Sequence, residues 1–316
     1  MRASYVDEFI EQGYTKIKAS DDLLVMLRRQ LQLGRALHDS TIEQKRRIFI
    51  GNGVGAKGYW PSGDEYSEFY DIKHENHICH ERKYRSFDFS LEPNGAGRNV
   101  TENILNAPNI WPDWIPGFQE ESQRVIKSLN SMASAVLIDS LHKVGVAAKP
   151  EDFSRSVGTM RLMKYRESSG SEILLPAHSD YEFITVSYCD VPGLEVVSKT
   201  GEIVRVGEEP DDLVLMAGDF LEVLSDFVIP APVHQVRPAA ERHSIVLFLC
   251  SNYGLCIRPG QIFSHEESLN NDPFSPAKHL CTMHLVNNPH LTDRVRSGQL
   301  NYMIPKDLRN PLKRHS

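Results

Sequence analysis

The sequence predicts a mixed α and β protein in which N-terminal helices pack on a double-sheet β core. Apolar residues recur at helical spacing in two long segments of the first half of the chain. From Val157 onward their period switches to two, and short strand candidates follow one another without helices between them. Such a series indicates a sandwich or a barrel, because successive strands of a parallel sheet need a helix between them.

Two long helices are expected before the strands begin. The first runs from Ser20 to about Phe49, with aspartates near its start and leucines along one face. The second runs from Pro116 to Val144 and carries a similar apolar side. Residues 50–100 are rich in Gly, Pro, Asn and Ser, which predicts loops with short strands such as Ser86–Ser90.

The strands of the second half are separated by turn signals such as Pro192-Gly193. The expected strands are Met160–Tyr165, Phe183–Tyr188, Leu194–Val197, Ile203–Val206, Leu213–Met216, Val233–Val236 and Ser244–Leu249. We therefore expect an N-terminal helical and loop region at 1–150, a β core at 151–262 and a C-terminal extension at 263–316. The sequence of the extension predicts polar loops and short helices, and this segment is a candidate cover for an active site.

The bulk composition excludes several classes of protein. The 316 residues, 41% of them hydrophobic, suffice for one large core or two modest ones. The net charge is −7 and no basic stripe appears, so nucleic acid and anionic membrane surfaces are not expected partners. No apolar run reaches ~18 residues and no signal-peptide pattern is present, which predicts a soluble, cytoplasmic protein.

The cysteines are odd in number and never spaced as C-x-x-C. We expect free thiols in a reducing compartment, not a disulfide framework or a zinc ribbon. These residues are Cys79, Cys189, Cys250, Cys256 and Cys281. No feature of the sequence predicts the oligomeric state.

The motif with the most chemical content is His178-Ser-Asp180, followed by His234 on a later strand candidate. Residues i and i+2 of a strand share one face, so His178 and Asp180 can point at one spot. Two imidazole nitrogens and one carboxylate oxygen, with positions left open, suit non-haem Fe(II) that binds oxygen and an organic co-substrate together. Arg242 and Ser244 are again i and i+2, and their donors suit a carboxylate. The chain is therefore interpreted as an iron-dependent oxygenase.

Other interpretations of these residues are less consistent with the whole set. Both histidines can be hydrogen-bonded core residues and Asp180 a turn former, but the ordered series of His-x-Asp, His and Arg-x-Ser argues against chance. Hydrolytic zinc sites usually carry both histidines on one helix as H-E-x-x-H, which this sequence lacks. Arg242 can be a solvated charge, but it adjoins an apolar run where unpaired burial is costly. A ligand carboxylate is the simplest partner for it.

A second stretch also contains residues that bind metals. His74, His77, Cys79 and His80 lie in a polar segment among charged neighbours. We interpret this stretch as surface.

The ordered motifs resemble the isopenicillin N synthase-like branch of the Fe(II)/2-oxoglutarate-dependent oxygenases, over most of the chain. That resemblance implies a double-stranded β-helix, or jelly roll, packed on N-terminal helices. It also implies Fe(II), 2-oxoglutarate and O2 as cofactors and co-substrates. The matching elements are Gly58-Tyr-Trp-Pro61 with Gly63 and Glu65, Ser86-Phe-Asp88, Pro108-Asn-Ile-Trp-Pro112, His178-Ser-Asp-Tyr181, Pro192-Gly193-Leu194, Gly218-Asp219, Pro232-Val-His234 and Arg242-His-Ser244.

The resemblance also implies roles for individual residues. His178, Asp180 and His234 match the iron ligands. Arg242 and Ser244 match the residues that bind the distal carboxylate of 2-oxoglutarate, and a matching tyrosine often assists them. That tyrosine is Tyr165. The chain departs from the family at Met163, where Asn is frequent, and at Arg166, where Pro is common.

The implied activity is hydroxylation, desaturation or oxidative cyclisation of a small molecule, with release of succinate and CO2. Natural products of secondary metabolism or amino-acid-derived compounds are the substrates that the resemblance suggests. Two alternatives stay open at this point. One is an oxidase of the same fold that uses O2 without 2-oxoglutarate, and the other is a non-catalytic metal-binding jelly roll.

Candidate substrate-binding residues follow from strand alternation. Arg161 and Met163 share one face with the inward-pointing tyrosine of the same strand, so they are expected to line the same cavity, with Arg161 available for an acidic group of the substrate. The alternative is that Met163 fills the core and Arg161 forms a salt bridge at the strand's edge. Further candidates for the lining are Tyr181, Phe183 and Phe220.

Overall fold

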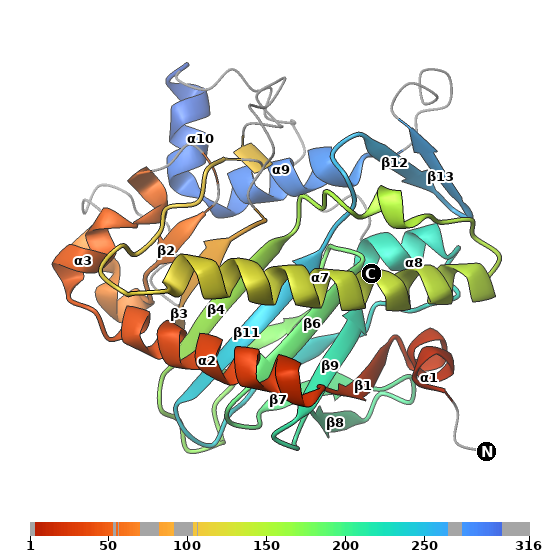
Figure 1. The fold of residues 1–316 in the computed structure, drawn as a ribbon, viewed down its shortest axis with the longest axis horizontal. Coiled ribbons are helices and arrows are strands. Elements are labelled where there is room, and N and C mark those ends of the chain that lie inside the picture. Colours follow the sequence, from red (N-terminus) through yellow and green to blue (C-terminus); the bar gives the residue numbers. More distant parts are fainter. Residues whose placement is uncertain are drawn as a thin grey trace.

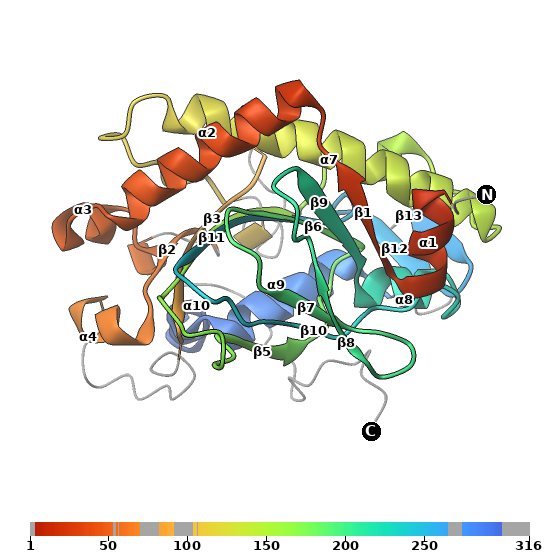
Figure 2. The same ribbon diagram turned by 90° about the horizontal axis from the view of Figure 1, so that it is seen from below.

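The described part of the chain forms two main antiparallel sheets, a third sheet of two strands and a layer of helices. The structure is a computed structural model that describes residues 4–52, 55, 57–69, 82–91, 104–105, 107–264 and 274–298. Figure 1 shows helices α2 (Asp21–His38) and α7 (Phe118–Lys143) lying across one face of the large sheet. In Figure 2 the smaller sheet lies on the opposite side, and α9 (Pro276–Asn287) lies close to the open end between the two sheets. The jelly-roll fold expected from the motifs is thereby confirmed.

Capping residues mark the starts of helices α2 and α3 (Ile42–Arg47). Ser20 accepts a hydrogen bond from the backbone of Leu23 at the start of α2, and the second long helix is α7 as expected. The first predicted helix, however, does not continue to Phe49. It ends at His38, because Thr41 and Gln44 form a capping box that starts a separate helix. The described residues also form helices α1 (Tyr5–Gln12), α4 (Tyr66–Phe69), α8 (Asp219–Leu224) and α10 (Pro289–Arg296), with 3-10 turns at Ile50–Asn52, Gly63–Glu65 and Pro150–Asp152.

The strands form one large, one smaller and one two-stranded sheet. The large sheet has the order β1-β9-β6-β11-β4-β3-β2, the smaller one β5-β10-β7-β8, and β12 pairs with β13. The strands are β1 (Tyr14–Lys18), β2 (Gly58–Trp60), β3 (Tyr84–Phe89), β4 (Thr159–Tyr165), β5 (Leu175–His178), β6 (Ile184–Cys189), β7 (Leu194–Val197), β8 (Ile203–Val206), β9 (Asp212–Ala217), β10 (His234–Val236), β11 (Arg242–Leu249), β12 (Leu255–Arg258) and β13 (Gln261–Ser264).

All the strands predicted in the second half are present within a residue or two of their expected ends. The strand expected through His178 and Asp180 is β5, which ends at His178, and the sequence did not predict β1, β12 and β13. Strand β5 reads Leu-Pro-Ala-His and is only partly buried, so it shows no apolar alternation. Strand β1 follows a left-handed glycine, Gly13, and pairs at the edge of the large sheet with β9.

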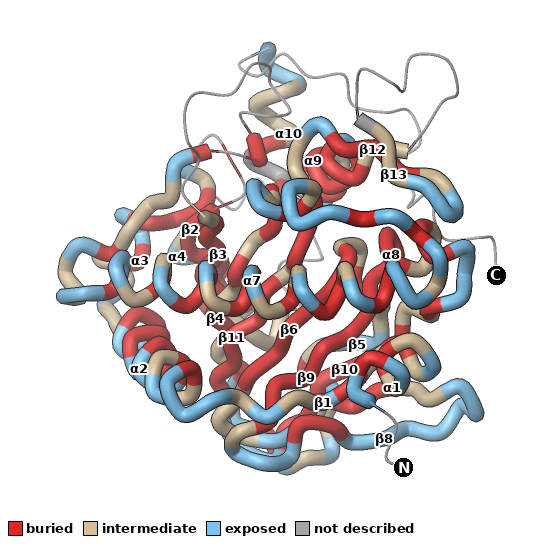
Figure 3. The backbone as a smooth tube through the Cα atoms, turned by 45° about the vertical axis from the view of Figure 1, so that its right-hand side comes forward, coloured by how far each residue is buried: buried red, intermediate tan, exposed pale blue. Residues whose placement is uncertain are grey.

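Alternation along β4 and β11 separates two cores. Leu162 of β4 and Ile245 and Leu247 of β11 belong to the larger core, which includes the buried faces of α2 and α7. Met163 and Tyr165 face the other way, into a smaller core shared with the four-stranded sheet. Figure 3 shows β4, β11, β6 and β9 as buried along most of their length. The interior between the sheets is therefore reached only by every second residue of each strand.

Two expectations from composition can be checked in the described part of the chain. Cys189, Cys250, Cys256 and Cys281 are free thiols, as predicted, and Cys79 lies outside the described residues together with the histidines beside it. Within the described ranges, no helix has the length and apolar character needed to cross a membrane.

Candidate active site

A cavity of about 280 Å³ lies between the two sheets. Its walls come from both sheets and from one face of α9. The residues that the sequence singled out for metal and carboxylate binding lie on opposite walls of this cavity. His178, Asp180 and His234 belong to β5, the turn after it and β10, whereas Arg242 and Ser244 belong to β11.

The two histidines meet because β5 and β10 pair antiparallel with His178 directly opposite His234. Their ring centroids are 4.4 Å apart. The Nε2 atom of His178 lies 3.6 Å from Oδ1 of Asp180, and Nε2 of His234 lies 3.5 Å from Oδ2 of the same carboxylate. One ligand atom from each residue falls within 4.8 Å of the others. Two nitrogens and one oxygen thus surround a single point, as a metal site requires.

Backbone carbonyls orient both imidazole rings. Nδ1 of His178 lies 2.8 Å from the carbonyl oxygen of Pro176, and Nδ1 of His234 lies 3.2 Å from that of Pro232. In the tautomer that donates from Nδ1, the lone pair of each ring is on Nε2, which is the atom that faces Asp180. Metal-binding histidines are commonly oriented by such a bond from the other ring nitrogen.

Asp180 lies just beyond the strand, not on it as the i, i+2 pattern predicted. Strand β5 ends at His178, and a turn carries the carboxylate back toward the histidines. Oγ1 of Thr185 donates to Oδ2 of Asp180 at 2.5 Å, and the backbone N–H of Asp219 donates to the carbonyl of Asp180 at 2.8 Å. Gly218 is needed here because a Cβ atom would overlap with the backbone of Glu182. The turn is therefore fixed before any ligand binds.

Arg242 lies in the wall opposite these three residues. The side chain is almost fully buried, with 1% of its surface exposed, and its guanidinium carbon lies 5.2 Å from the centroid of the Tyr165 ring. Its Nε donates to the carbonyl of Val191 at 3.0 Å. No carboxylate of the described residues lies within 4 Å of its nitrogens. Oγ of Ser244 is also buried without a hydrogen-bond partner among these residues. Donors buried in this way fit the carboxylate of a ligand.

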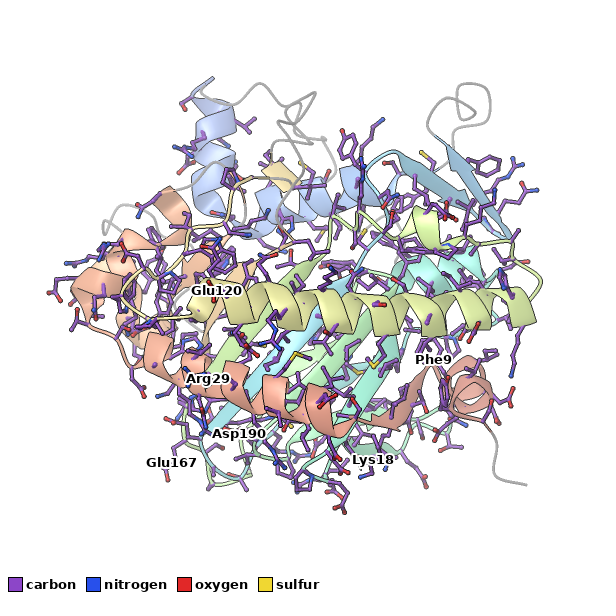
Figure 4. All side chains as sticks on the ribbon, in the orientation of Figure 1. Phe9, Lys18, Arg29, Glu120, Glu167 and Asp190 are labelled. Atoms are coloured by element: carbon purple, nitrogen blue, oxygen red, sulfur yellow. The ribbon has the colours of Figure 1, made fainter. Side chains whose placement is uncertain are left out.

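Other polar contacts near Arg242 stabilise the cavity wall and do not face a ligand. Tyr165 is buried, and its hydroxyl donates to Sδ of Met163 at 3.3 Å. Asp190, labelled in Figure 4, accepts from the backbone of His243 at 2.8 Å and from Arg35 of α2 at 2.6 Å. Burial alone raises the pKa of Asp190, but the bonds from His243 and Arg35 outweigh burial and hold the pKa at about 2. Strand β11 is thereby tied to a helix directly beside Arg242.

The far part of the cavity contains a different set of charges. Arg161 lines the cavity, but it also forms two parallel hydrogen bonds to Asp88 of β3, at 2.8 and 2.7 Å. Glu182 faces the same space from the turn before β6, and burial, followed by the charge of Asp180, raises its pKa to about 8. His284 of α9 completes this part, and burial lowers its pKa to about 4.

The remaining substrate-binding candidates divide into two groups in the structure. Met163 and Tyr181 contribute to the cavity wall. Phe183 and Phe220 do not. Their rings are fully buried and pack against each other at 5.6 Å, and Phe183 also packs against Phe153 at 5.5 Å. Aromatic rings next to the metal-binding turn therefore fill the core, where they bury more surface than the cavity wall offers.

Sequence reasoning missed several residues that line the cavity. Glu182 was not among the candidates, and the α9 residues were included only as part of the extension at 263–316, with none named individually. For α9 a signal exists, since the residues that face the cavity are spaced i, i+3, i+4 and i+7: Leu280, Met283, His284 and Asn287. Glu182 carries no such signal, because a single acid in a turn follows no period.

A jelly roll with two histidines and one carboxylate in its cavity defines a class, the non-haem iron enzymes of this fold. Similarity to known proteins supports the same class. Residues 156–251 match the model of the 2OG-Fe(II) oxygenase superfamily. The chain is similar to homoarginine-6-hydroxylase 2-ODD-C23 of Glycine max, at 22% identity in an alignment 303 residues long that covers 90% of this chain and 85% of that protein.

Two solved structures share the fold. One is a full-length Neurospora crassa protein in complex with alpha-KG, with a TM-score of 0.68 and 18% identity over 90% of this chain and 89% of that one. The other is the dioxygenase for auxin oxidation in rice, with a TM-score of 0.61 and 19% identity over 93% of this chain and 88% of that one. Residues 156–251 thus form a 2OG-Fe(II) oxygenase region, and the chain is a non-haem Fe(II)- and 2-oxoglutarate-dependent dioxygenase that uses O2.

Proposed function

We propose that His178, Asp180 and His234 hold the Fe(II) of this dioxygenase. Two imidazoles and one carboxylate that leave open positions are a donor set that suits Fe(II). When bound, the metal supplies the activation of O2, coupled to oxidation of 2-oxoglutarate to succinate and CO2. The chain supplies the orientation: Thr185 fixes the carboxylate and backbone carbonyls fix both rings, so the ligands need little rearrangement.

We propose that 2-oxoglutarate binds with its distal carboxylate on Arg242 and Ser244, with Tyr165 beside them. The buried guanidinium without a carboxylate partner among the described residues is the observation that carries this assignment. An arginine in such a position costs free energy unless an anion joins it, and a planar fork meets a carboxylate with two hydrogen bonds. The unpartnered Oγ of Ser244 supplies a further donor on the same wall.

The substrate is proposed to be a small amino-acid-derived compound or natural product that the enzyme hydroxylates, desaturates or cyclises. The names of similar proteins support a small substrate: homoarginine for the Glycine max protein and auxin for the rice structure. A cavity of about 280 Å³ suits molecules of that size. A place in secondary metabolism is part of the same proposal.

We also propose that the three regions expected from the sequence have separate roles: support at 1–150, chemistry at 151–262 and a cover at 263–316. The stripe of α9 residues in the cavity wall supports the last role, since Leu280 and Met283 close the space with apolar surface. Exclusion of water from the reacting centre is what such a cover contributes.

The test of the proposed function is succinate release from 2-oxoglutarate. Purified protein is supplied with Fe(II), O2 and 2-oxoglutarate, with and without a panel of small amino acids and aromatic acids. We expect stimulated succinate release with some members of the panel, and binding of 2-oxoglutarate that depends on a divalent metal, measured by calorimetry with Mn²⁺. O2 consumption without any need for 2-oxoglutarate would instead favour the oxidase. Metal binding without turnover or 2-oxoglutarate binding would favour the non-catalytic jelly roll.

A further inference from the structure

The cavity has a second end that 2-oxoglutarate does not occupy when its carboxylate is on Arg242. In the register of β11 with β4, Arg242 lies opposite Tyr165 and Val246 lies opposite Arg161. Four residues of a strand span about 13 Å. A short dicarboxylate that also reaches the metal ligands on the other wall cannot extend along the sheet to Arg161. The space at that end is therefore left for the substrate.

The only cation at this end, among the described residues of the wall, is already paired. Both Nε and Nη2 of Arg161 donate to the carboxylate of Asp88, which is 1% exposed. This arrangement is a bidentate arginine–carboxylate pair, so the two charges largely offset each other. The face of the guanidinium lies over the Phe248 ring, 5.3 Å from its centroid. Arg161 therefore contributes little net positive charge to the cavity.

Glu182 has no such partner. It is partly buried, it lines the cavity, and no Lys, Arg or His nitrogen of the described residues lies within 4 Å of its carboxylate. His284 on the facing helix is neutral over the ordinary pH range, since burial disfavours its charged form. Arg161 and Asp88 offset each other, so the carboxyl group of Glu182 is the acid at this end that has no cation beside it among the described residues.

We propose that Glu182 binds a cationic group of the substrate, an ammonium or a guanidinium, and is the specificity-determining residue for substrate charge. The proposal rests on the proposed function, because it concerns the substrate of the same iron centre. Aromatic rings favour an organic cation further, since Tyr181, next to Glu182 in the chain, and Phe248, beside Arg161, line the cavity. Glu182 follows Asp180 by two residues, so the bound cation and the metal lie within the length of one small molecule.

A competing explanation is that Glu182 is an ordinary acid solvated by water in an open cavity. The two explanations differ in what they predict for a pair of ligands of equal shape and different charge. L-homoarginine ends in a guanidinium, and L-homocitrulline replaces that group by a neutral urea of nearly the same size. A binding site built around a carboxylate distinguishes them, whereas a solvated acid does not.

The experiment measures binding of both probes by calorimetry to the Mn²⁺- and 2-oxoglutarate-loaded protein, and succinate release with each probe under Fe(II) and O2. It compares the wild type with Glu182→Gln, which keeps the shape and removes the charge. Glu202→Gln, at an exposed position in the β7–β8 connection, is the matched control. We expect the wild type to bind L-homoarginine about tenfold or more tightly than L-homocitrulline, because a charge-assisted hydrogen bond is lost with the urea.

In Glu182→Gln the preference should fall to about threefold or less, with an unchanged Kd for 2-oxoglutarate and unchanged metal content. The control should keep the wild-type preference. Equal binding of both probes by the wild type, or a preference that survives in Glu182→Gln, would overturn the role of Glu182. A wild type that binds neither metal nor 2-oxoglutarate would instead overturn the proposed function, which is a separate result. Melting temperatures of all three proteins show whether a loss reflects unfolding.

Discussion

The two ends of the cavity are built from the same kinds of residues, yet their charges are arranged in opposite ways. At the end formed by Tyr165, Arg242 and Ser244, an arginine is buried and no carboxylate of the described residues lies within 4 Å of its nitrogens. At the end that contains Glu182, the arginine is paired with Asp88 and a carboxylate is left over. The first end is thus suited to an anion and the second to a cation.

This difference shows that an arginine in a cavity wall does not by itself indicate an anion site. What matters is whether its charge is already neutralised by the protein. Arg161 and Arg242 are four residues apart in register on neighbouring strands and face the same cavity. Their roles differ because of their protein contacts: a bidentate pair to Asp88 neutralises one guanidinium, whereas the other bonds to the Val191 carbonyl and to Cys189 and has no carboxylate of the described residues bound to it.

The largest expected effect is at the metal ligands, which both ends depend on. Asp180→Ala should abolish 2-oxoglutarate turnover, because it removes the only charged ligand and leaves two imidazoles that hold Fe(II) much more weakly. Iron content and succinate release are the measurements. Asp113→Ala, at an exposed position, is the control. Wild-type iron content and activity in Asp180→Ala would refute the assignment of the metal site.

Arg242→Lys should have the next largest effect. Lysine keeps the charge but loses the planar fork, so the KM for 2-oxoglutarate should rise about tenfold or more, which corresponds to roughly 1.5–3 kcal/mol for a charge-assisted hydrogen bond. Arg237→Lys, whose arginine pairs with Glu195 away from the cavity, is the control. If Arg242→Lys had the same KM for 2-oxoglutarate as Arg237→Lys, the assignment of Arg242 to the carboxylate of 2-oxoglutarate would be wrong.

The sequence was sufficient to propose the metal ligands and the carboxylate-binding residues because these occur as short local motifs. Arg-x-Ser places two side chains by strand geometry, whereas the two residues of His-x-Asp meet because a turn follows the strand end at His178; the order of the motifs adds the second histidine. The strands of the core could be predicted for the same reason, since Met160–Tyr165 and Ser244–Leu249 alternate clearly. The break after His38 was also predictable from Thr41 and Gln44, which match a capping box.

The Glu182 end could not be predicted in this way. Asp88 and Arg161 are 73 residues apart in the chain, and only the pairing of β3 with β4 places them opposite each other. The sequence therefore offered two interpretations of Arg161, as a substrate contact and as a salt-bridge partner, and the structure shows a side chain that both lines the cavity and forms the salt bridge. Phe183 was misplaced because the turn before β6 ends the simple alternation.

Removal of Asp88 tests whether its pairing with Arg161 sets the character of the Glu182 end. In Asp88→Asn the guanidinium loses its ionic partner, and the net charge at this end rises by one. We expect binding of L-homoarginine to weaken about threefold to fivefold, and the free energy of unfolding to fall by about 1–3 kcal/mol because a buried charge is left unpaired. Calorimetry and urea unfolding measure the two effects. Asp39→Asn, whose aspartate pairs with Lys164 at an exposed position, should leave both nearly unchanged.

The smallest effect is expected at Asp190, which accepts hydrogen bonds from His243, the neighbour of Arg242, and from Arg35 of α2. The pKa of Asp190 is held at about 2, below its ordinary value of 3.8, so its ionised form stabilises the folded protein above about pH 4. That contribution is lost as the pH falls through the folded pKa. Asp190→Asn should therefore lower the free energy of unfolding by about 1–2 kcal/mol at pH 7, and the two proteins should converge as the pH approaches 2. Urea unfolding at a series of pH values measures this difference. Because His243 adjoins Arg242, Asp190→Asn should raise the KM for 2-oxoglutarate only about twofold. A difference in the free energy of unfolding that grew toward low pH would contradict the role of Asp190.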